Sequence, residues 1–227
     1  MINREDLPFI SNVLSLHNTN VDTSFMHNVL TAIKDNEYMQ KDILDSLSNN
    51  QFKSKLKLLD IINHLDILDV NTEIVIFGSW FGSILLPNLS PIAKKITCID
   101  LEEDVLKIAK NKLFPYLNNV DYIPGNVFEK DLSRYHTCDL FVNTSCEHMQ
   151  PMKEWPFWSY VKSGSIYAFQ SNNMYQIDTH INCVSSIDEF KEQMPKNLEI
   201  LCEHELEEER GTRFSLVGKI IKNEGIE

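Results

Sequence analysis

Two short apolar runs with a glycine-containing turn between them constrain the fold of this chain more than any other feature. Residues 74–77 form the first run, which breaks at Gly78 and Gly82. Residues 96–99 form the second run, which ends at Asp100. The pattern predicts a strand, a tight turn, a helix and a second strand. In such a unit the glycines let the backbone approach a ligand, and an acid at the end of the second strand accepts hydrogen bonds from both hydroxyls of a ribose.

The segment 74–104 resembles the first two motifs of the class I S-adenosylmethionine-dependent methyltransferases. It departs from them at Phe77, where the family usually has an acid, and at Trp80, where it has the middle glycine of Gly-x-Gly-x-Gly. A dinucleotide-binding dehydrogenase is a weaker match, because Trp80 also occupies the second glycine position of the pyrophosphate-binding turn. The two glycines are also compatible with an ordinary strand-to-helix turn that binds nothing.

The resemblance implies S-adenosylmethionine as the cofactor. Asn126 follows a third predicted strand, where the family often places an acid against the adenine amino group, and its side-chain carbonyl can accept the same hydrogen bond. An Asn in a Pro-Gly turn is equally well explained by its tolerance of left-handed backbone geometry. The expected cofactor-binding residues are Gly78, Ser79, Trp80, Gly82, Asp100, Leu101, Asn126, Val127, Asn143 and Thr144.

Charge and composition limit the partners of the chain. A formal charge of −12 over 227 residues disfavours DNA or RNA as a substrate. The lysines at residues 53–57 and the acidic run at 203–209 are expected to be solvated surface. We see neither a membrane-spanning run nor a secretory signal, and we expect a cytoplasmic protein. Five scattered cysteines without a Cys-x-x-Cys pair favour reduced thiols and predict no metal site.

Helical periodicity predicts an N-terminal extension ahead of the α/β domain. Apolar residues recur at helical spacing in residues 24–34 and 52–66, before the first strand, and again in residues 103–113. We expect residues 1–50 to form a helical extension or cap that closes over the site. Residues 51–227 are then the Rossmann-like domain that binds S-adenosylmethionine.

The remaining apolar runs predict five further strands. The last two are long, are joined across a charged turn at residues 207–211, and match the terminal antiparallel pair that the resemblance implies. We therefore expect an α/β fold with a mostly parallel seven-stranded sheet and helices on both faces. The five strands are predicted at residues 120–123, 140–142, 166–169, 198–204 and 213–221.

An unusually polar run at residues 143–149 follows the fourth predicted strand. Ligands of open α/β sheets bind beyond the carboxyl ends of the strands, so we expect this run in the ligand crevice. Glu147 and His148 are the candidate acid–base pair, because a carboxylate beside an imidazole can take a proton from an amine or hydroxyl while a methyl group moves. Asn143 is the third candidate catalytic residue, in a positioning role. The alternatives are a structural hydrogen-bonding role for His148 and a helix start at the Glu-His pair.

A second polar run, at residues 170–175, follows the fifth predicted strand, with His180 beyond it. Uncharged amides and hydroxyls can recognise a carboxylate, amide or hydroxyl of a substrate, although a turn favours the same residue types. The aromatic cluster at residues 155–160 is expected to be core rather than a substrate wall. The expected substrate-binding residues are Gln170, Asn172, Asn173 and Tyr175.

These features predict a transferase that methylates a small polar metabolite with S-adenosylmethionine. Two other classes stay open. One is a different use of the same cofactor, by aminocarboxypropyl transfer, cyclisation or elimination. The other is a binding or regulatory module that kept the fold and lost the reaction. The sequence leaves the acceptor, the modified atom and the oligomeric state open.

Overall fold

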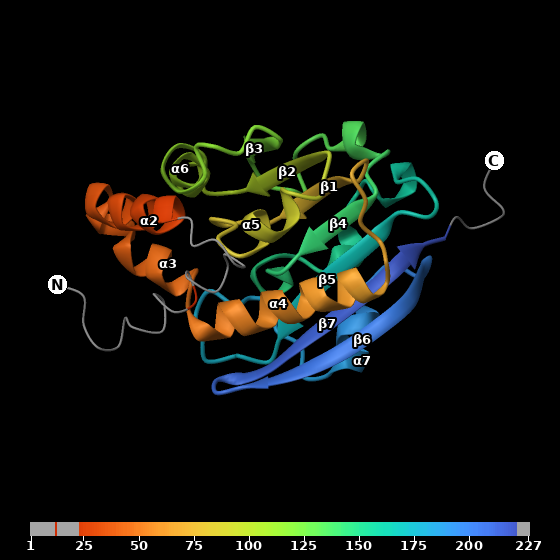
Figure 1. Cartoon of the computed structure of the whole chain (residues 1–227). Helices are drawn as coiled ribbons and strands as arrows, with labels where there is room; N and C mark the ends of the chain where they lie inside the picture. The colour runs from red at the N-terminus through yellow and green to blue at the C-terminus, as the bar shows by residue number, and fades with distance from the viewer. Residues whose placement is uncertain (1–11, 13–22, 222–227) are drawn as a thin grey trace.

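A seven-stranded sheet forms the centre of the molecule in a computed structural model, which describes residue 12 and residues 23–221 (Figure 1). The strands are β1 Glu73–Phe77, β2 Lys95–Asp100, β3 Val120–Pro124, β4 Leu140–Asn143, β5 Ile166–Asn172, β6 Leu198–Glu208 and β7 Gly211–Ile220. Their order in the sheet is β3-β2-β1-β4-β5-β7-β6. β7 is antiparallel to β5 and β6, and the other pairs are parallel. The predicted strands and the predicted terminal antiparallel pair are confirmed.

Helices surround the sheet (Figure 1). They are α2 Thr23–Asp35, α3 Gln40–Asp45, α4 Asn49–His64, α5 Leu85–Leu89, α6 Glu103–Ile108 and α7 Ile187–Glu192. The predicted helices are confirmed as α2, α4, α5 and α6, and α6 continues into a π-helical turn, Ala109–Leu113. α3 and α7 were not predicted, because six residues each are too few for a helical period to show. None of the described helices is long and apolar enough to span a bilayer.

The two faces of the central strands pack into two apolar clusters. On β1, Ile74 and Ile76 are buried with α2, α4, α5 and α6, whereas Val75 and Phe77 are buried with α7 and Trp155. Burial on both faces explains why this strand reads as a continuous apolar run. Trp155 and Trp158 are only 3% and 7% exposed, so the prediction that the aromatic cluster is core is confirmed for its two tryptophans.

The described part of the N-terminal extension packs at the side of the domain. Phe25 of α2 stacks on Phe114 with ring centroids 5.2 Å apart, and Asn28 donates to the Leu113 carbonyl at 3.2 Å. Phe25 belongs to the same buried cluster as Ile74. The helical character predicted for this region is confirmed in α2 and α3. Residues 1–11 and 13–22 lie outside the described residues, and closure over the site stays a prediction.

The turn between β6 and β7 lies at the carboxyl ends of the parallel strands. In the register between β5 and β7, Asn172 pairs with Arg213 and Gln170 pairs with Ser215. The tip of the hairpin therefore lies on the same side of the molecule as α2 and α3 (Figure 1). Side chains from β5, β6 and β7 can meet there with the loop that follows β4.

Candidate functional site

The turn after β1 has the backbone of a glycine-rich turn, although one of its glycines is replaced. Gly78, Trp80 and Gly82 all have positive φ, at 55°, 48° and 64°. Bulky residues rarely have positive φ. Trp80 nevertheless has it, so the backbone at this position has the conformation that a glycine would adopt. Its half-buried ring packs against Phe81, with centroids 5.4 Å apart, and joins the apolar cluster of α4 and α5. The substitution thus leaves the course of the turn intact.

Asp100 lies where the end of β2 meets this turn. Its Oδ2 accepts the Trp80 backbone N–H at 2.7 Å, and its Oδ1 accepts the Glu102 N–H at 3.0 Å. Each carboxylate oxygen has a further lone pair, so the half-buried group can still accept the hydroxyls of a ribose. The next side chain, Leu101, is 72% exposed and offers an apolar surface beside the carboxylate.

Asn126 caps the turn after β3 with its side chain, but it is not among the described residues with positive φ, so the left-handed geometry suggested as an alternative is wrong. Its Oδ1 accepts the Phe128 N–H at 3.0 Å, and its Nδ2 donates to Glu129 at 3.1 Å. One lone pair of the half-buried carbonyl remains for an adenine amino group. The neighbouring Val127 is 5% exposed and belongs to the second apolar cluster, and its carbonyl accepts the Trp155 indole N–H.

The loop after β4 is folded back onto the first turn. Ser145 donates from Oγ to the Gly78 carbonyl at 3.1 Å. Asn143 is fully buried: its Oδ1 accepts the Ser145 N–H at 2.9 Å and its Nδ2 lies 3.1 Å from the Met149 sulfur. Thr144 is 6% exposed. Asn143 therefore shapes the loop, with its side-chain polar atoms already engaged within the protein.

The two candidate acid–base residues, Glu147 and His148, lie in different environments. Glu147 is 3% exposed, and its Oε1 accepts from Asn172 Nδ2 at 2.6 Å and lies 3.4 Å from a guanidinium nitrogen of Arg213. His148 is exposed, and its Nδ1 lies 3.1 Å from the Thr179 carbonyl. The structure thus brings Glu147 to Asn172, as the two predicted crevice runs imply, and adds Arg213, which the sequence did not single out.

Two further charged side chains, Glu208 and Lys55, join Glu147 and Arg213 from distant parts of the chain. Arg213 Nε lies 3.6 Å from the Glu208 carboxylate, and both side chains are at most 4% exposed. Lys55 of α4 interacts electrostatically with Arg213, Glu147 and Glu208. Burial, with a smaller effect of Arg213, lowers the pKa of Lys55 to about 7. Burial likewise raises the pKa of Glu208.

Two predictions of solvated surface are wrong at these positions. In the 53–57 segment Ser54 is fully buried and Lys55 is half-buried, because the side of α4 that carries them faces the sheet. In the 203–209 run the Glu208 side chain is only 2% exposed. From Cys202 to Glu208, every second residue of β6 is less exposed than its neighbours. The two-residue period of a strand, counted from Cys202, therefore predicts that Glu208 faces the protein.

The second polar run also differs from its predicted form. Gln170, Ser171 and Asn172 were expected beyond the strand, but β5 extends through them, and each is at most 1% exposed. Pairing with β7 satisfies their backbones, which removes the need for a solvent-exposed turn. Asn173 instead accepts the Thr212 N–H at 2.7 Å, and Tyr175 is 60% exposed.

Buried polar atoms without hydrogen-bond partners gather around these charges. Gln170 donates from Nε2 to the Ser54 carbonyl and to Ser215 Oγ, both at 3.0 Å, but its Oε1 has no partner within the described part of the chain. The same is true of Glu147 Oε2, both Glu208 oxygens and Arg213 Nε. Proteins rarely leave such atoms unpaired, so these atoms are candidates for pairing with a polar ligand. We use the name polar chamber for the charged and amide side chains that gather here: Lys55, Glu147, Gln170, Asn172, Glu208 and Arg213.

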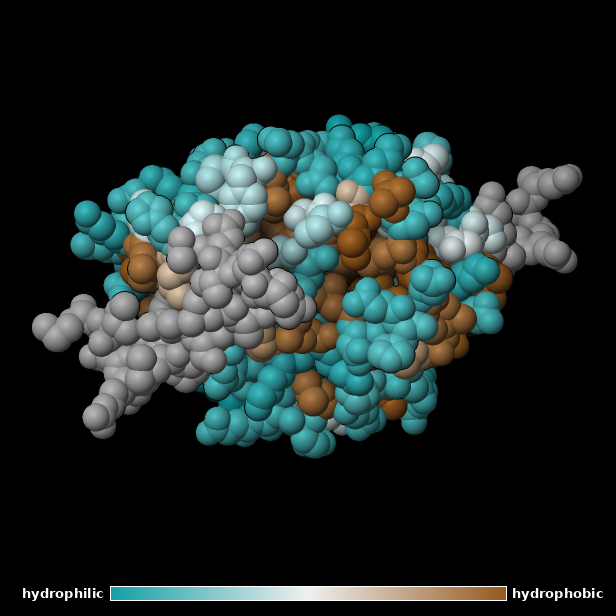
Figure 2. Space-filling model, in the orientation of Figure 1, coloured by the Kyte–Doolittle hydropathy of each residue, from teal (hydrophilic) through white to brown (hydrophobic). Residues whose placement is uncertain are grey.

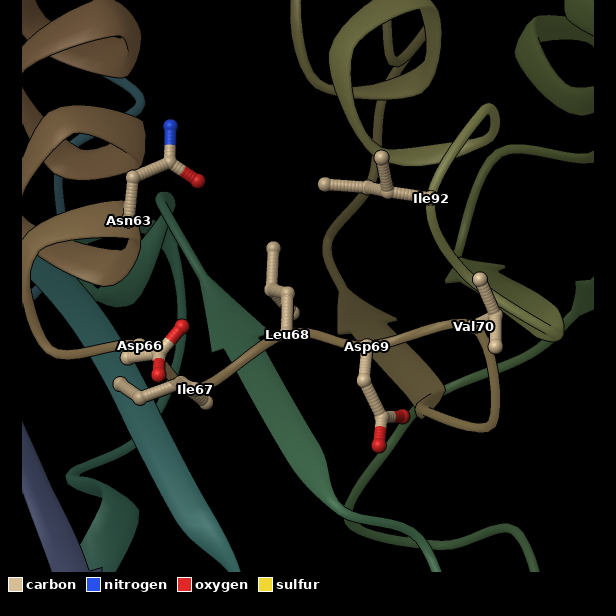
Figure 3. A pocket seen from close by; sticks show the side chains of 7 residues that line it. All are labelled: Asn63, Asp66, Ile67, Leu68, Asp69, Val70 and Ile92. Atoms are coloured by element: carbon tan, nitrogen blue, oxygen red, sulfur yellow. The ribbon is translucent and has the colours of Figure 1, made fainter.

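Two cavities lie away from the polar chamber. The larger, about 270 Å³, is lined by Asn63, Asp66, Ile67, Leu68, Asp69, Val70 and Ile92, from the segments that precede β1 and β2 (Figure 3). Apolar atoms gather on this face over the connection from α4 to β1 (Figure 2). The other, about 240 Å³, is lined by residues at or near the starts of β1, β2 and β3, Glu73, Lys95 and Asp121 among them. Because ligands of this sheet type bind at the carboxyl ends, neither cavity matches the expected site.

Comparison with known proteins identifies the architecture. No protein-family model and no curated protein sequence matches the chain. A structure of N-methyltransferase NodS from Bradyrhizobium japonicum WM9 in complex with S-adenosyl-L-homocysteine aligns with a TM-score of 0.63 at 10% identity, over 88% of this chain and 100% of that one. A SAM-dependent methyltransferase from Aquifex aeolicus aligns with a TM-score of 0.51 at 16% identity, over 72% and 89%. The chain therefore has the Rossmann-like fold of the class I S-adenosylmethionine-dependent methyltransferases.

Proposed function

We propose that the chain transfers the methyl group of S-adenosylmethionine to a small polar metabolite. The observation that carries this proposal is the position of the polar chamber. It includes Gln170 and Asn172 at the carboxyl end of β5 and Glu147 from the loop after β4, and that loop is tied to the first turn by the 3.1 Å hydrogen bond from Ser145 to Gly78. A cofactor in that turn and an acceptor in the polar chamber would thus be neighbours.

The residues of the first turn fit an adenosyl group. Asp100 keeps free lone pairs for a ribose, Leu101 presents an exposed apolar side chain for the adenine ring, and Asn126 keeps one carbonyl lone pair for its amino group. Gly78 is half-buried and Gly82 is buried, so Gly78 is the glycine at which the backbone of the turn can approach a ligand. S-adenosylmethionine supplies a methyl group on an already electrophilic sulfonium, so orientation of the acceptor provides much of the acceleration.

The polar chamber favours an acceptor that can donate hydrogen bonds. Arg213 and Glu208 are paired at 3.6 Å, and Gln170 Oε1 and Glu147 Oε2 are left as buried acceptors. A ligand that donates hydrogen bonds through hydroxyl, amine or ammonium groups would satisfy these atoms. In this role Glu147 orients the acceptor and takes its proton, and Asn172 and Arg213 hold the carboxylate in place.

Mass spectrometry of the reaction products tests this function. The protein is incubated with S-adenosylmethionine labelled in its methyl group, first alone and then with a fractionated metabolite extract. S-adenosylhomocysteine together with a methylated small molecule is the expected result. Methylthioadenosine together with a carbon-chain product would replace methyl transfer by one of the other uses of the cofactor. The absence of turnover in every fraction would favour a binding module.

A further inference from the structure

Three side chains that can bind a metal ion, one carboxylate and two imidazoles, converge beside the polar chamber. Glu147 and His148 lie on the 3₁₀ turn Cys146–His148, and His180 lies on the loop after β5. One potential ligand atom from each of the three lies within 4.8 Å of the others. The two imidazoles meet edge to face with centroids 4.6 Å apart. A hydrogen bond of 2.9 Å from the Asn182 N–H to the Glu147 carbonyl ties the two segments together.

The carboxylate of Glu147 is oriented like a ligand that lacks its ion. Its Oε1 is held by Asn172 at 2.6 Å and by Arg213 at 3.4 Å. Its Oε2 is buried and has no hydrogen-bond partner within the described residues. The neighbouring carboxylate of Glu208 offsets the charge of Arg213, from which it lies 3.6 Å away. The negative charge of Glu147 is therefore available to a cation.

The two histidines are arranged to offer lone pairs. His148 Nδ1 lies 3.1 Å from the Thr179 carbonyl, which places the proton on Nδ1 and leaves Nε2 free. Metal-ligating histidines usually donate their second ring nitrogen to a carbonyl or carboxylate in this way. His180 is half-buried, and its ring meets that of His148 edge to face.

We propose that Glu147, His148 and His180 bind one divalent transition-metal ion, such as Zn²⁺. Two imidazoles and one carboxylate suit this class, whereas Mg²⁺ and Ca²⁺ prefer oxygen ligands alone. Zinc sites with three protein ligands keep a coordination position open for water or substrate. The prediction of no metal site rested on the cysteine spacing, and this cluster uses no cysteine. If the proposed function is correct, the open position holds an oxygen or nitrogen of the acceptor, and with the ion bound Glu147 orients the acceptor through the ion instead of taking its proton directly.

Metal binding is tested on the full-length, tag-free protein after chelator treatment and dialysis. Calorimetry with ZnCl₂ and the visible spectrum with CoCl₂ are recorded for the wild type and for His148→Ala, His180→Ala and Glu147→Gln. We expect one ion per chain and an affinity roughly tenfold to a hundredfold weaker, or weaker still, in each variant. The matched control is His136→Ala, which removes an exposed histidine outside the cluster and should bind like the wild type.

Two outcomes would overturn the site. One is no binding of Zn²⁺ by folded wild-type protein at about a hundredfold excess. The other is unchanged binding in the double variant His148→Ala, His180→Ala. These experiments require no substrate, so they stand apart from the proposed function. If zinc binds as expected and no methyl transfer is found, the site is retained and only the methyltransferase proposal fails.

Discussion

The carboxylate of Asp100 supports the first turn, and in the proposed function it also accepts the hydroxyls of the ribose. Asp100→Ala removes the acceptor of the Trp80 N–H, which lies 2.7 Å away. We expect it to weaken the binding of S-adenosylhomocysteine by about 1.5 to 3 kcal/mol, or roughly tenfold to a hundredfold. Calorimetry measures this, with urea unfolding to confirm that the variant is folded. Asp104→Ala, at an exposed carboxylate in the next helix, is the control. Equal affinity in both variants would assign the ribose to another residue.

Glu147 is the residue at which binding and chemistry should separate. Glu147→Gln keeps the size of the side chain and an oxygen for Asn172, but removes the charge. We expect turnover to fall by ~10²-fold to 10⁴-fold with little change in cofactor affinity. Single-turnover kinetics with the acceptor and calorimetry with S-adenosylhomocysteine give the two quantities. Glu154→Gln, at an exposed position nearby, should retain full activity. Equal turnover in the two variants would remove Glu147 from the mechanism.

Lys55 gives the fold a pH dependence of known sign. Its pKa falls from 10.5 to about 7 on folding, so between these values the unfolded chain binds more protons. The contribution of Lys55 to stability therefore rises as the pH rises from 7 to 10. Lys55→Met lacks this dependence. In urea unfolding, the free energy of Lys55→Met minus that of the wild type should be largest near pH 7 and shrink toward pH 10. A constant difference would mean that folding does not lower the pKa of Lys55.

The first turn and α5 are built around the absence of a side chain at Gly82. A Cβ at Gly82 would lie 2.8 Å from the Leu86 side chain, and φ is 64°. We expect Gly82→Ala to destabilise the fold by about 1–3 kcal/mol more than Gly164→Ala, measured by chemical denaturation. Gly164 also has positive φ, but an added Cβ there meets only Lys219, at 3.8 Å. An equal loss of stability in the two variants would mean that the positive φ, and not the contact with Leu86, makes glycine necessary at residue 82.

Strands and longer helices could be predicted because each carries a local pattern. The end of β5 could not, since Gln170, Ser171 and Asn172 have the composition of a turn. They form a strand because β7 pairs with them, and that pairing comes from residues 213–215. The position of Asn143 at the end of β4 was predicted, but its contacts to Met149 and Ser145 were not, because they depend on how the loop folds.

On the scale of the whole molecule, the order of motifs predicted a mostly parallel seven-stranded sheet with a terminal antiparallel pair, and the structure confirms both. The order of the strands in the sheet was not predicted. The polar chamber could not be predicted in the same way. It assembles Lys55, Glu147, Glu208 and Arg213 from α4, the loop after β4, and the two hairpin strands, and no local pattern links them.

The binding of S-adenosylhomocysteine by the whole protein, followed by calorimetry and by thermal unfolding, tests the central claim most directly. A ligand that binds only the folded chain stabilises it by about 2.7 kcal/mol at a hundred times its dissociation constant. For a chain of 227 residues this corresponds to a rise in Tm of about 5–10 °C. We expect such a rise in Tm together with one calorimetric binding site. An unchanged Tm and no heat of binding at millimolar ligand, in well-folded protein, would contradict it.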